Sequence, residues 1–211
     1  MATDLNNRNI GTCSQKVRKI SVLLKYIVDK IDNDQEIKRL VTYLTGTPIS
    51  NSGKGYDGKV ISQPDLTHSL LKDYLVNGVT VHEKSLFDSR FNSDIEVLTK
   101  NQIFVHSTRS RINEKANTQK IEFFIDILIS QNYEYLQNYG EKRTYEIADR
   151  IANLLDGIYI ENDEIVDIVG NAKTVIDGDI VSSRLSKTNN IIWLSVPIVV
   201  NCMAVRVRKD V

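Results

Sequence analysis

Apolar residues recur at every third or fourth position in several stretches of the chain, and this spacing places them on one side of a helix. The clearest stretches run from Ser14 to Ile31 and from Glu141 to Leu155, and a shorter one runs from Asp34 to Leu44. A fourth stretch begins at Pro64 and continues to Leu75, stopping near Asn77-Gly78. The pattern therefore predicts three helices and one further short helix.

Alternation of apolar and polar residues begins near residue 101 and predicts strands. Ile103 and Val105 alternate with polar neighbours, and the run from Ile121 to Ser130 carries isoleucine or phenylalanine at every second position. Asp177-Gly178 is a favoured hairpin turn between two later strands, and Pro197 predicts an edge position or a bulge for the last strand. These later strands are expected at Glu164–Val169, Thr174–Ile176, Asp179–Leu185 and Ile191–Val200.

Two segments interrupt this periodicity. Gly46 to Pro64 holds four of the ten glycines and two of the three prolines, which predicts a loop. Residues 107–120 are polar and form an arm between two strands that is longer than a hairpin needs. The order of elements predicts an α+β fold, in which helices pack on a mixed, mainly antiparallel sheet. We expect a single domain over residues 1–211, with a loop-rich insertion at about 46–100 and a protruding arm at about 107–120.

The composition is that of an ordinary globular chain. Its 211 residues are 41% hydrophobic, and a chain of this size can bury a full core without metal or cross-links. No stretch approaches the roughly 18 consecutive apolar residues of a membrane span, and the polar start does not resemble a signal peptide. Cys13 and Cys202 lie near opposite ends without a partner motif, which fits a reducing cytoplasm. Secretion, membrane insertion and a thiol-based site are therefore not expected.

Charge is balanced over the chain but not along it. The 27 basic and 27 acidic residues give zero net charge, which argues against a dedicated nucleic-acid binder. The net charge is +3 over residues 1–44, −6 over residues 141–181 and +4 over residues 182–211. Such segregation suits a protein whose acidic face meets a basic face, within the fold or on a neighbouring copy. Solvated faces are the alternative interpretation.

Motifs that bind cofactors or metals fail in their context. The stretch Gly53 to Lys59 fits a phosphate-binding loop, but Val60 stands where a Mg²⁺-binding hydroxyl is needed and no apolar strand precedes Gly53. His68, His82 and His106 are 14 and 24 residues apart and lack the spacing of zinc ligands. We therefore expect no catalytic, cofactor-binding or metal-binding residues, and no enzyme activity.

The basic arm is the polar feature that stands out. It carries Arg109, Arg111, Lys115 and Lys120 against Glu114 alone. Four cations can contact phosphates or an acidic protein surface, but the arm has no aromatic residue on which bases could stack. We take these four cations as candidate assembly contacts, and a disordered solvated loop as the alternative.

Three stretches of the chain resemble proteins of the head–tail neck of tailed bacteriophages. Asp34–Leu44, followed by Gln63–Thr67, is similar to a segment that recurs in neck proteins of phages with AT-rich genomes. Ile121–Ser130 is similar to a long central strand, and Arg143–Gly157, with its Ile-Ala-Asp-x-Ile and Leu-Leu-Asp-Gly patterns, to the helix after it. The chain thus resembles the tail terminator, or tail-completion, family.

This resemblance implies a structural virion protein made in the bacterial cytoplasm. It implies a ring, usually six-fold, that caps the head-proximal end of the tail tube, ends its growth and joins it to the head connector. Its partners would be further copies of itself, the tube protein, a connector or stopper protein, and DNA passing through the lumen. A connector adaptor, a stopper or a sheath-associated neck protein is the first alternative, and a nucleic-acid-binding module is the second.

Overall fold

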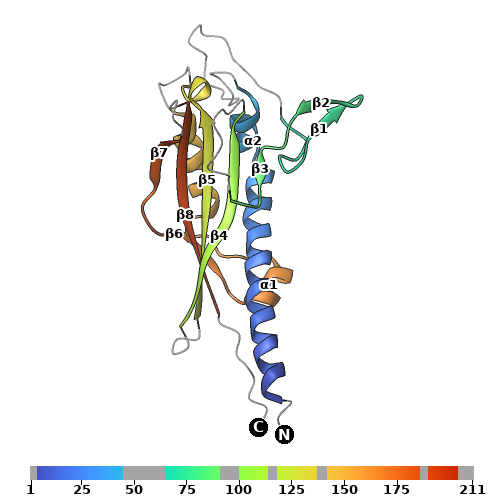
Figure 1. Cartoon of the computed structure of the whole chain (residues 1–211), viewed down its shortest axis with the longest axis vertical. Coiled ribbons are helices and arrows are strands. Elements are labelled where there is room, and N and C mark those ends of the chain that lie inside the picture. Colours follow the sequence, from blue (N-terminus) through green and yellow to red (C-terminus); the bar gives the residue numbers. More distant parts are fainter. Residues whose placement is uncertain are drawn as a thin grey trace.

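The computed structural model describes residues 4–44, 65–90, 100–113, 118–136, 142–185 and 190–203. The predicted loop at Gly46–Pro64, with its phosphate-loop-like stretch, lies outside these ranges. The described elements form an α+β fold in which helices pack on a mixed, mostly antiparallel sheet, as predicted. Figure 1 shows a long N-terminal helix running beside the sheet and past its lower end.

The main sheet is built around two long central strands, β5 (Thr118–Ser130) and β8 (Ile191–Met203), which pair antiparallel with each other. On its other side, β5 pairs antiparallel with β4 (Gln102–Asn113). The short β3 (Leu86–Phe87) adds in parallel to β4. β6 (Lys173–Ile176) and β7 (Val181–Leu185) both pair with β8, so the order is β3-β4-β5-β8 with β6 and β7 on the far edge.

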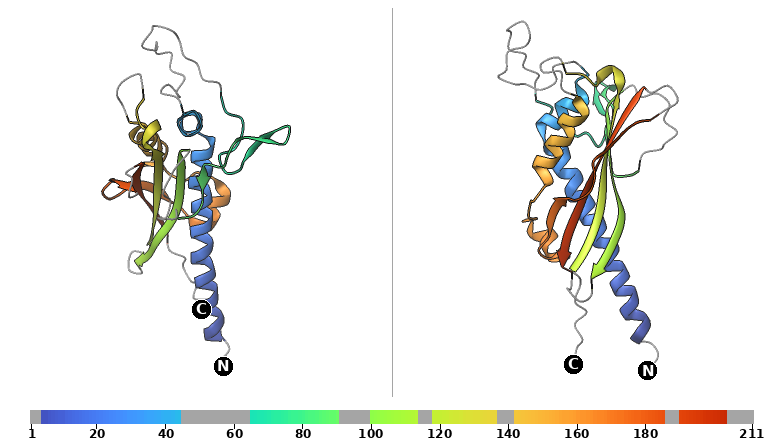
Figure 2. Two further views of the ribbon diagram at one scale, coloured as in Figure 1. Left: turned by 45° about the horizontal axis from the view of Figure 1, so that its top comes forward. Right: turned by 90° about the vertical axis from the view of Figure 1, so that its left-hand side faces the viewer.

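Helices cover one face of this sheet, as the side view in Figure 2 shows. They are α1 (Asp4–Asn33), α2 (Gln35–Thr42), α3 (Arg143–Leu155) and α4 (Asp163–Val169), and a short 3-10 turn, η1 (Gln131–Tyr133), follows β5. The predicted isoleucine stripe of β5 faces the helices and is fully buried from Ile121 to Ile129. It meets buried residues of α1 such as Leu23 and Ile27 in one continuous core, which explains why the alternation predicted this strand correctly.

The three helices that were predicted correctly have boundaries within two residues of the sequence pattern, except at the start of α1. That helix begins at Asp4 rather than Ser14. The pattern missed its first residues because the sequence before Ser14 is mostly polar and has no apolar stripe. Asp34 caps α2 by accepting a hydrogen bond from the backbone N–H of Ile37 at 2.9 Å. The predicted helices 34–44 and 141–155 are thus confirmed within a few residues.

The predicted helix from Pro64 to Leu75 is wrong. Leu66 instead exchanges two hydrogen bonds with the Gln35 side chain, and the backbone N–H of Leu70 donates to Asp32, so this segment is held against α1 and α2. The chain then forms a separate hairpin, β1 (Tyr74–Val76) and β2 (Val79–His82). Asn77 and Gly78 both have positive φ, as a tight two-residue hairpin turn requires.

Two strand predictions in the last third also need correction. Residues 164–169 lie in helix α4, because Asn162 accepts a hydrogen bond from the Ile165 N–H and Gly170 ends the helix at φ 71°. β6 and β7 do not form a hairpin with each other but lie end to end on the same edge of β8. Pro197 faces the gap between them, so this central strand tolerates a proline without a bulge or an edge position.

Candidate assembly surfaces

The predicted arm is mostly strand. β4 runs to Asn113 and β5 begins at Thr118, so residues 107–113 and 118–120 belong to paired strands rather than to a loop. We call these residues the ribbon; on its other edge, residues 118–120 also pair with residues 201–203 of β8. The polar sequence hid this extension because its exposed residues break the alternation, and a bulge between Ser107 and Arg109 shifts the register. Figure 1 shows the ribbon reaching below α4.

The structure places three of the four candidate cations on this ribbon. Arg109 and Arg111 are exposed and pair in register with Glu122 and Lys120. Lys120 forms an ion pair with Asp177 at 2.7 Å, and that hydrogen bond raises the pKa of Lys120. Lys115 lies outside the described residues. Arg109 and Arg111 are therefore better placed than Lys120 to contact a partner.

A second surface is the β1–β2 hairpin, which stands apart from the main sheet in Figure 1. Its apolar side chains are unusually exposed, up to 68% for Val79. Tyr74 and His82 at its base stack against His68, with ring centroids 4.6 Å and 4.8 Å from that of His68. The exposed apolar residues of this hairpin are Leu75, Val76, Val79 and Val81.

The three rings of His68, Tyr74 and His82 anchor the hairpin to the body. Burial lowers the pKa of both His68 and His82, and the neighbouring charges of His82 and Lys38 lower the pKa of His68 further. The sequence did not indicate this contact, because the two histidines are 14 residues apart and meet only through the hairpin. The neutral stack fixes the hairpin at its base and leaves its tip in solvent.

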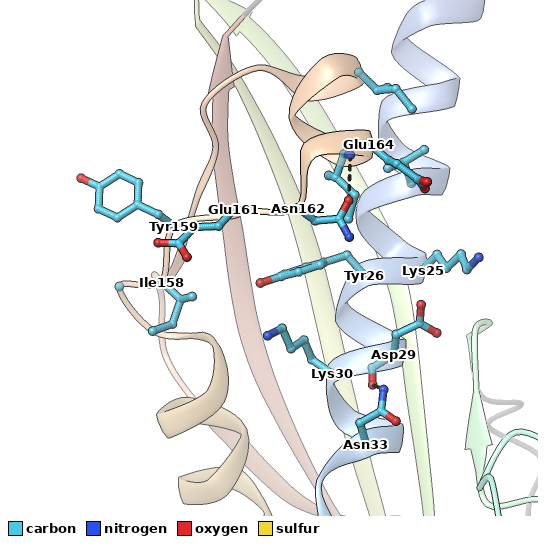
Figure 3. A pocket seen from close by; sticks show the side chains of 14 residues that line it. Lys25, Tyr26, Asp29, Lys30, Asn33, Ile158, Tyr159, Glu161, Asn162 and Glu164 are labelled. Atoms are coloured by element: carbon cyan, nitrogen blue, oxygen red, sulfur yellow. Dashed lines mark hydrogen bonds between the residues drawn. The ribbon is translucent and has the colours of Figure 1, made fainter.

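A third surface is a groove between α1 and the chain from Gly157 to Ile168, with a volume of about 830 Å³. Figure 3 shows the ring of Tyr26 crossing this groove from α1 toward Glu161. Burial, and to a lesser degree Glu161, raise the pKa of Tyr26. Lys30 lies over the same ring, 5.5 Å from its centroid. The groove thus combines an aromatic floor with charged residues of both signs.

The sheet face opposite the helices carries a buried polar group. Asp126 is 2% exposed and accepts a hydrogen bond from the Trp193 indole at 3.0 Å. The Nδ1 atom of His106 lies 3.4 Å from the other carboxylate oxygen. Burial lowers the pKa of His106, although Asp126 acts in the opposite direction. These groups border an apolar pocket of about 380 Å³ that also contains Phe124.

The stretches that carry the phage resemblance meet in space. Arg150 of α3 forms ion pairs with Asp34 at 3.1 Å and with Glu36 at 3.0 Å. Arg39 of α2 pairs with Asp65, and Arg143 donates to the carbonyl oxygen of Leu40 in α2. These contacts connect residues 34–44, 65–67 and 143–150 on the helix-covered side of the sheet.

No group of three or more His, Cys, Asp or Glu side chains in the described ranges is arranged to hold a metal ion. No helix in those ranges is long and apolar enough to cross a membrane.

The fold and these surfaces define an α+β protein with helices on one face of its sheet and with a ribbon, a hairpin and a groove open to partners. A family model described as YomW matches residues 34–174, which is two thirds of the chain, and the chain belongs to the YomW family. That name is of the kind given to proteins of a Bacillus phage of the SPBc2 type, so the chain is a phage-related protein. A comparison with curated proteins finds no significant match.

Sequence reasoning found the ribbon and missed the hairpin and the groove. The dipeptide Asn77-Gly78 between apolar residues was a usable signal for the hairpin, since it is a strong marker of a two-residue turn. The groove had no such signal, because α1 and the loop before α4 are more than 100 residues apart in the sequence.

Proposed function

We propose that this chain is a structural virion protein of a tailed phage. In this proposal it assembles into a ring, usually six-fold, at the head-proximal end of the tail tube, where it ends tail growth and joins the tail to the head connector. Its partners are further copies of itself, the tube protein and the connector or stopper, with DNA passing through the lumen. It acts by assembly and not by catalysis.

One observation carries the proposal, namely the exposed apolar β1–β2 hairpin. A two-stranded hairpin alone is only marginally stable, and exposed apolar side chains gathered on one element, here with Val76 paired to Val79, favour a protein partner. Full burial of one valine or leucine side chain contributes about 1.5–3 kcal/mol, so Leu75, Val76, Val79 and Val81 offer a substantial driving force for association. Membership of a phage-related family, and an α+β fold of the class that the tail terminator resemblance implies, support the particular setting.

The direct test is the mass of the purified protein in solution, followed by imaging of particles with and without tail tubes. We expect rings, and rings at one end of the tubes. Val79→Asp should weaken assembly strongly, whereas Val17→Asp, at a comparably exposed valine of α1, should not. A strict monomer that never caps a tube would overturn the proposal.

Other neck roles and nucleic-acid binding make different predictions. An adaptor or stopper would form rings that bind the connector but not the tube. The cationic row Arg111, Lys120 and Lys173, which lies on one sheet face by strand register, is the observation that favours nucleic acid. DNA binding that weakens steeply with salt would support that role, and undetectable binding would remove it.

A further inference from the structure

The groove on α1 has one wall of a single charge. Of the residues that line the groove between Gly157 and Ile168, two are acidic and none is basic. Glu161 and Glu164 line the groove directly, and Figure 3 shows them on the side of α4 and the loop before it. Lys25, Asp29 and Lys30 of α1 line the other wall. The groove is open to solvent and has a volume of about 830 Å³.

The ribbon has the complementary charge. Its described residues, 107–113 and 118–120, include three basic residues and no acidic one, and Lys120 is paired with Asp177 of the same chain. Arg109 and Arg111 are exposed on one side of it, and Ile112, 37% exposed, is on the other. Such a ribbon can place cations against a carboxylate wall and an apolar side chain against an aromatic floor such as Tyr26.

The ribbon of the same chain lies away from this groove. Among the described residues, none of those that line the groove belongs to β4 or β5. In Figures 1 and 2 the ribbon extends along the sheet beyond α4. A groove and a ribbon are also different surfaces, so a contact between them joins two copies head to tail, which is the kind of interface that closes a ring.

We propose that the β4–β5 ribbon of one copy docks into the groove between α1 and residues 157–168 of the next copy. The proposal rests on the proposed function in so far as both require self-association, and it names the two surfaces that meet. Arg109 and Arg111 face Glu161 and Glu164 of the neighbour, and the partner is a second copy of this chain.

A charge exchange tests the proposal. Arg111→Glu alone and Glu161→Lys alone should each weaken self-association by roughly tenfold or more, because each places like charges together. The double variant should recover most of the affinity. Lys72→Glu and Asp88→Lys are matched controls at exposed positions away from both surfaces and should leave the affinity unchanged. Sedimentation velocity measures the affinity, and circular dichroism checks that each variant is folded.

A cross-link gives an independent measurement. A mixture of Arg111→Cys and Glu161→Cys chains should form an intermolecular disulfide on mild oxidation, while a mixture of Lys72→Cys and Glu161→Cys should not. Rings that assemble normally with the charge variants and without this cross-link would overturn the proposal and leave the proposed function standing. A chain that neither self-associates nor caps tubes would overturn both.

Discussion

The guanidinium of Arg143, at the start of α3, donates hydrogen bonds to the carbonyl oxygens of Leu40 and Tyr43 at the end of α2. Arg143 is fully buried, and burial lowers its pKa to about 10, so it remains charged at neutral pH. It also donates through Nε to the carbonyl oxygen of Tyr133 in η1, at 2.6 Å. A buried cation at the start of α3 thus binds the carbonyl oxygens at the C-terminal end of α2, where a positive charge is favoured.

Replacing Arg143 by Met should destabilise the fold strongly. The change leaves buried carbonyl oxygens and the nearby buried Glu134 without their cation, which typically costs about 3–5 kcal/mol. Chemical denaturation measures the free energy of unfolding. Arg150→Met is the matched control, because its ion pairs with Asp34 and Glu36 are partly exposed and should contribute about 1 kcal/mol or less. Equal losses in the two variants would contradict this assignment.

Acidification should loosen the β1–β2 hairpin. The pKa values of His68 and His82 are lowered in the folded state, so the unfolded chain binds more protons as the pH falls below about 6.5. The stability contributed by the stack is therefore present above this pH and lost as the pH falls through the lowered folded values. Lys38 and Asp32 also act on His68, with opposite effects.

Thermal unfolding at pH 7.5 and pH 5.5 should show this loss, and NMR signals of the hairpin should report it locally. His82→Phe keeps a ring for stacking but cannot bind a proton, so it should reduce the pH dependence. His106, whose pKa burial also lowers, lies on the sheet and not at the hairpin. Its NMR signal therefore serves as a comparison within the same molecule. An unchanged pH dependence in His82→Phe would assign the effect to another group.

The single tryptophan of the chain reports on the sheet face opposite the helices. Asp126→Leu removes the carboxylate that the Trp193 indole contacts and should cost about 1–3 kcal/mol. Asp126→Asn keeps an oxygen in the same place and should cost less. Tryptophan fluorescence and denaturation measure both effects, and a larger loss for Asn than for Leu would argue against the hydrogen bond.

Gly178→Ala should destabilise the edge between β6 and β7. Gly178 has φ 130°, which residues with a side chain rarely adopt, and an added Cβ would lie 3.3 Å from Cγ of Pro197. Strain of this kind costs about 1–3 kcal/mol. Asp179→Ala, at the exposed next residue, serves as the control in the same denaturation experiment. Equal stability of Gly178→Ala and the original chain would show that this turn can relax.

The sequence predicted the elements whose burial is regular. Ile121–Ser130 and Arg143–Leu155 each bury one side against the same core, so their periodicity was sufficient. Periodicity failed where side-chain hydrogen bonds determine the backbone conformation, as at Leu66 and Leu70. It also failed where an N-cap residue, Asn162, starts a helix in an apolar run. Local periodicity contains neither kind of information.

The candidate site was only partly predictable for a related reason. Charge counting found Arg109 and Arg111, because a cluster of cations is visible in one segment. It could not show that Lys120 is held by Asp177, 57 residues away, or that Tyr26 and Glu161 border one groove. Those relationships depend on strand register and helix packing, which are set by the whole fold.

The two described ends of the chain lie on the same side of the molecule. α1 begins beyond the lower end of the sheet in Figure 1, and Met203 pairs with Thr118 at the end of the ribbon. In a ring of identical copies, labels attached near Asp4 and Met203 should therefore lie on the same side of each subunit. Images of labelled particles would then reveal how the subunit is oriented in such a ring.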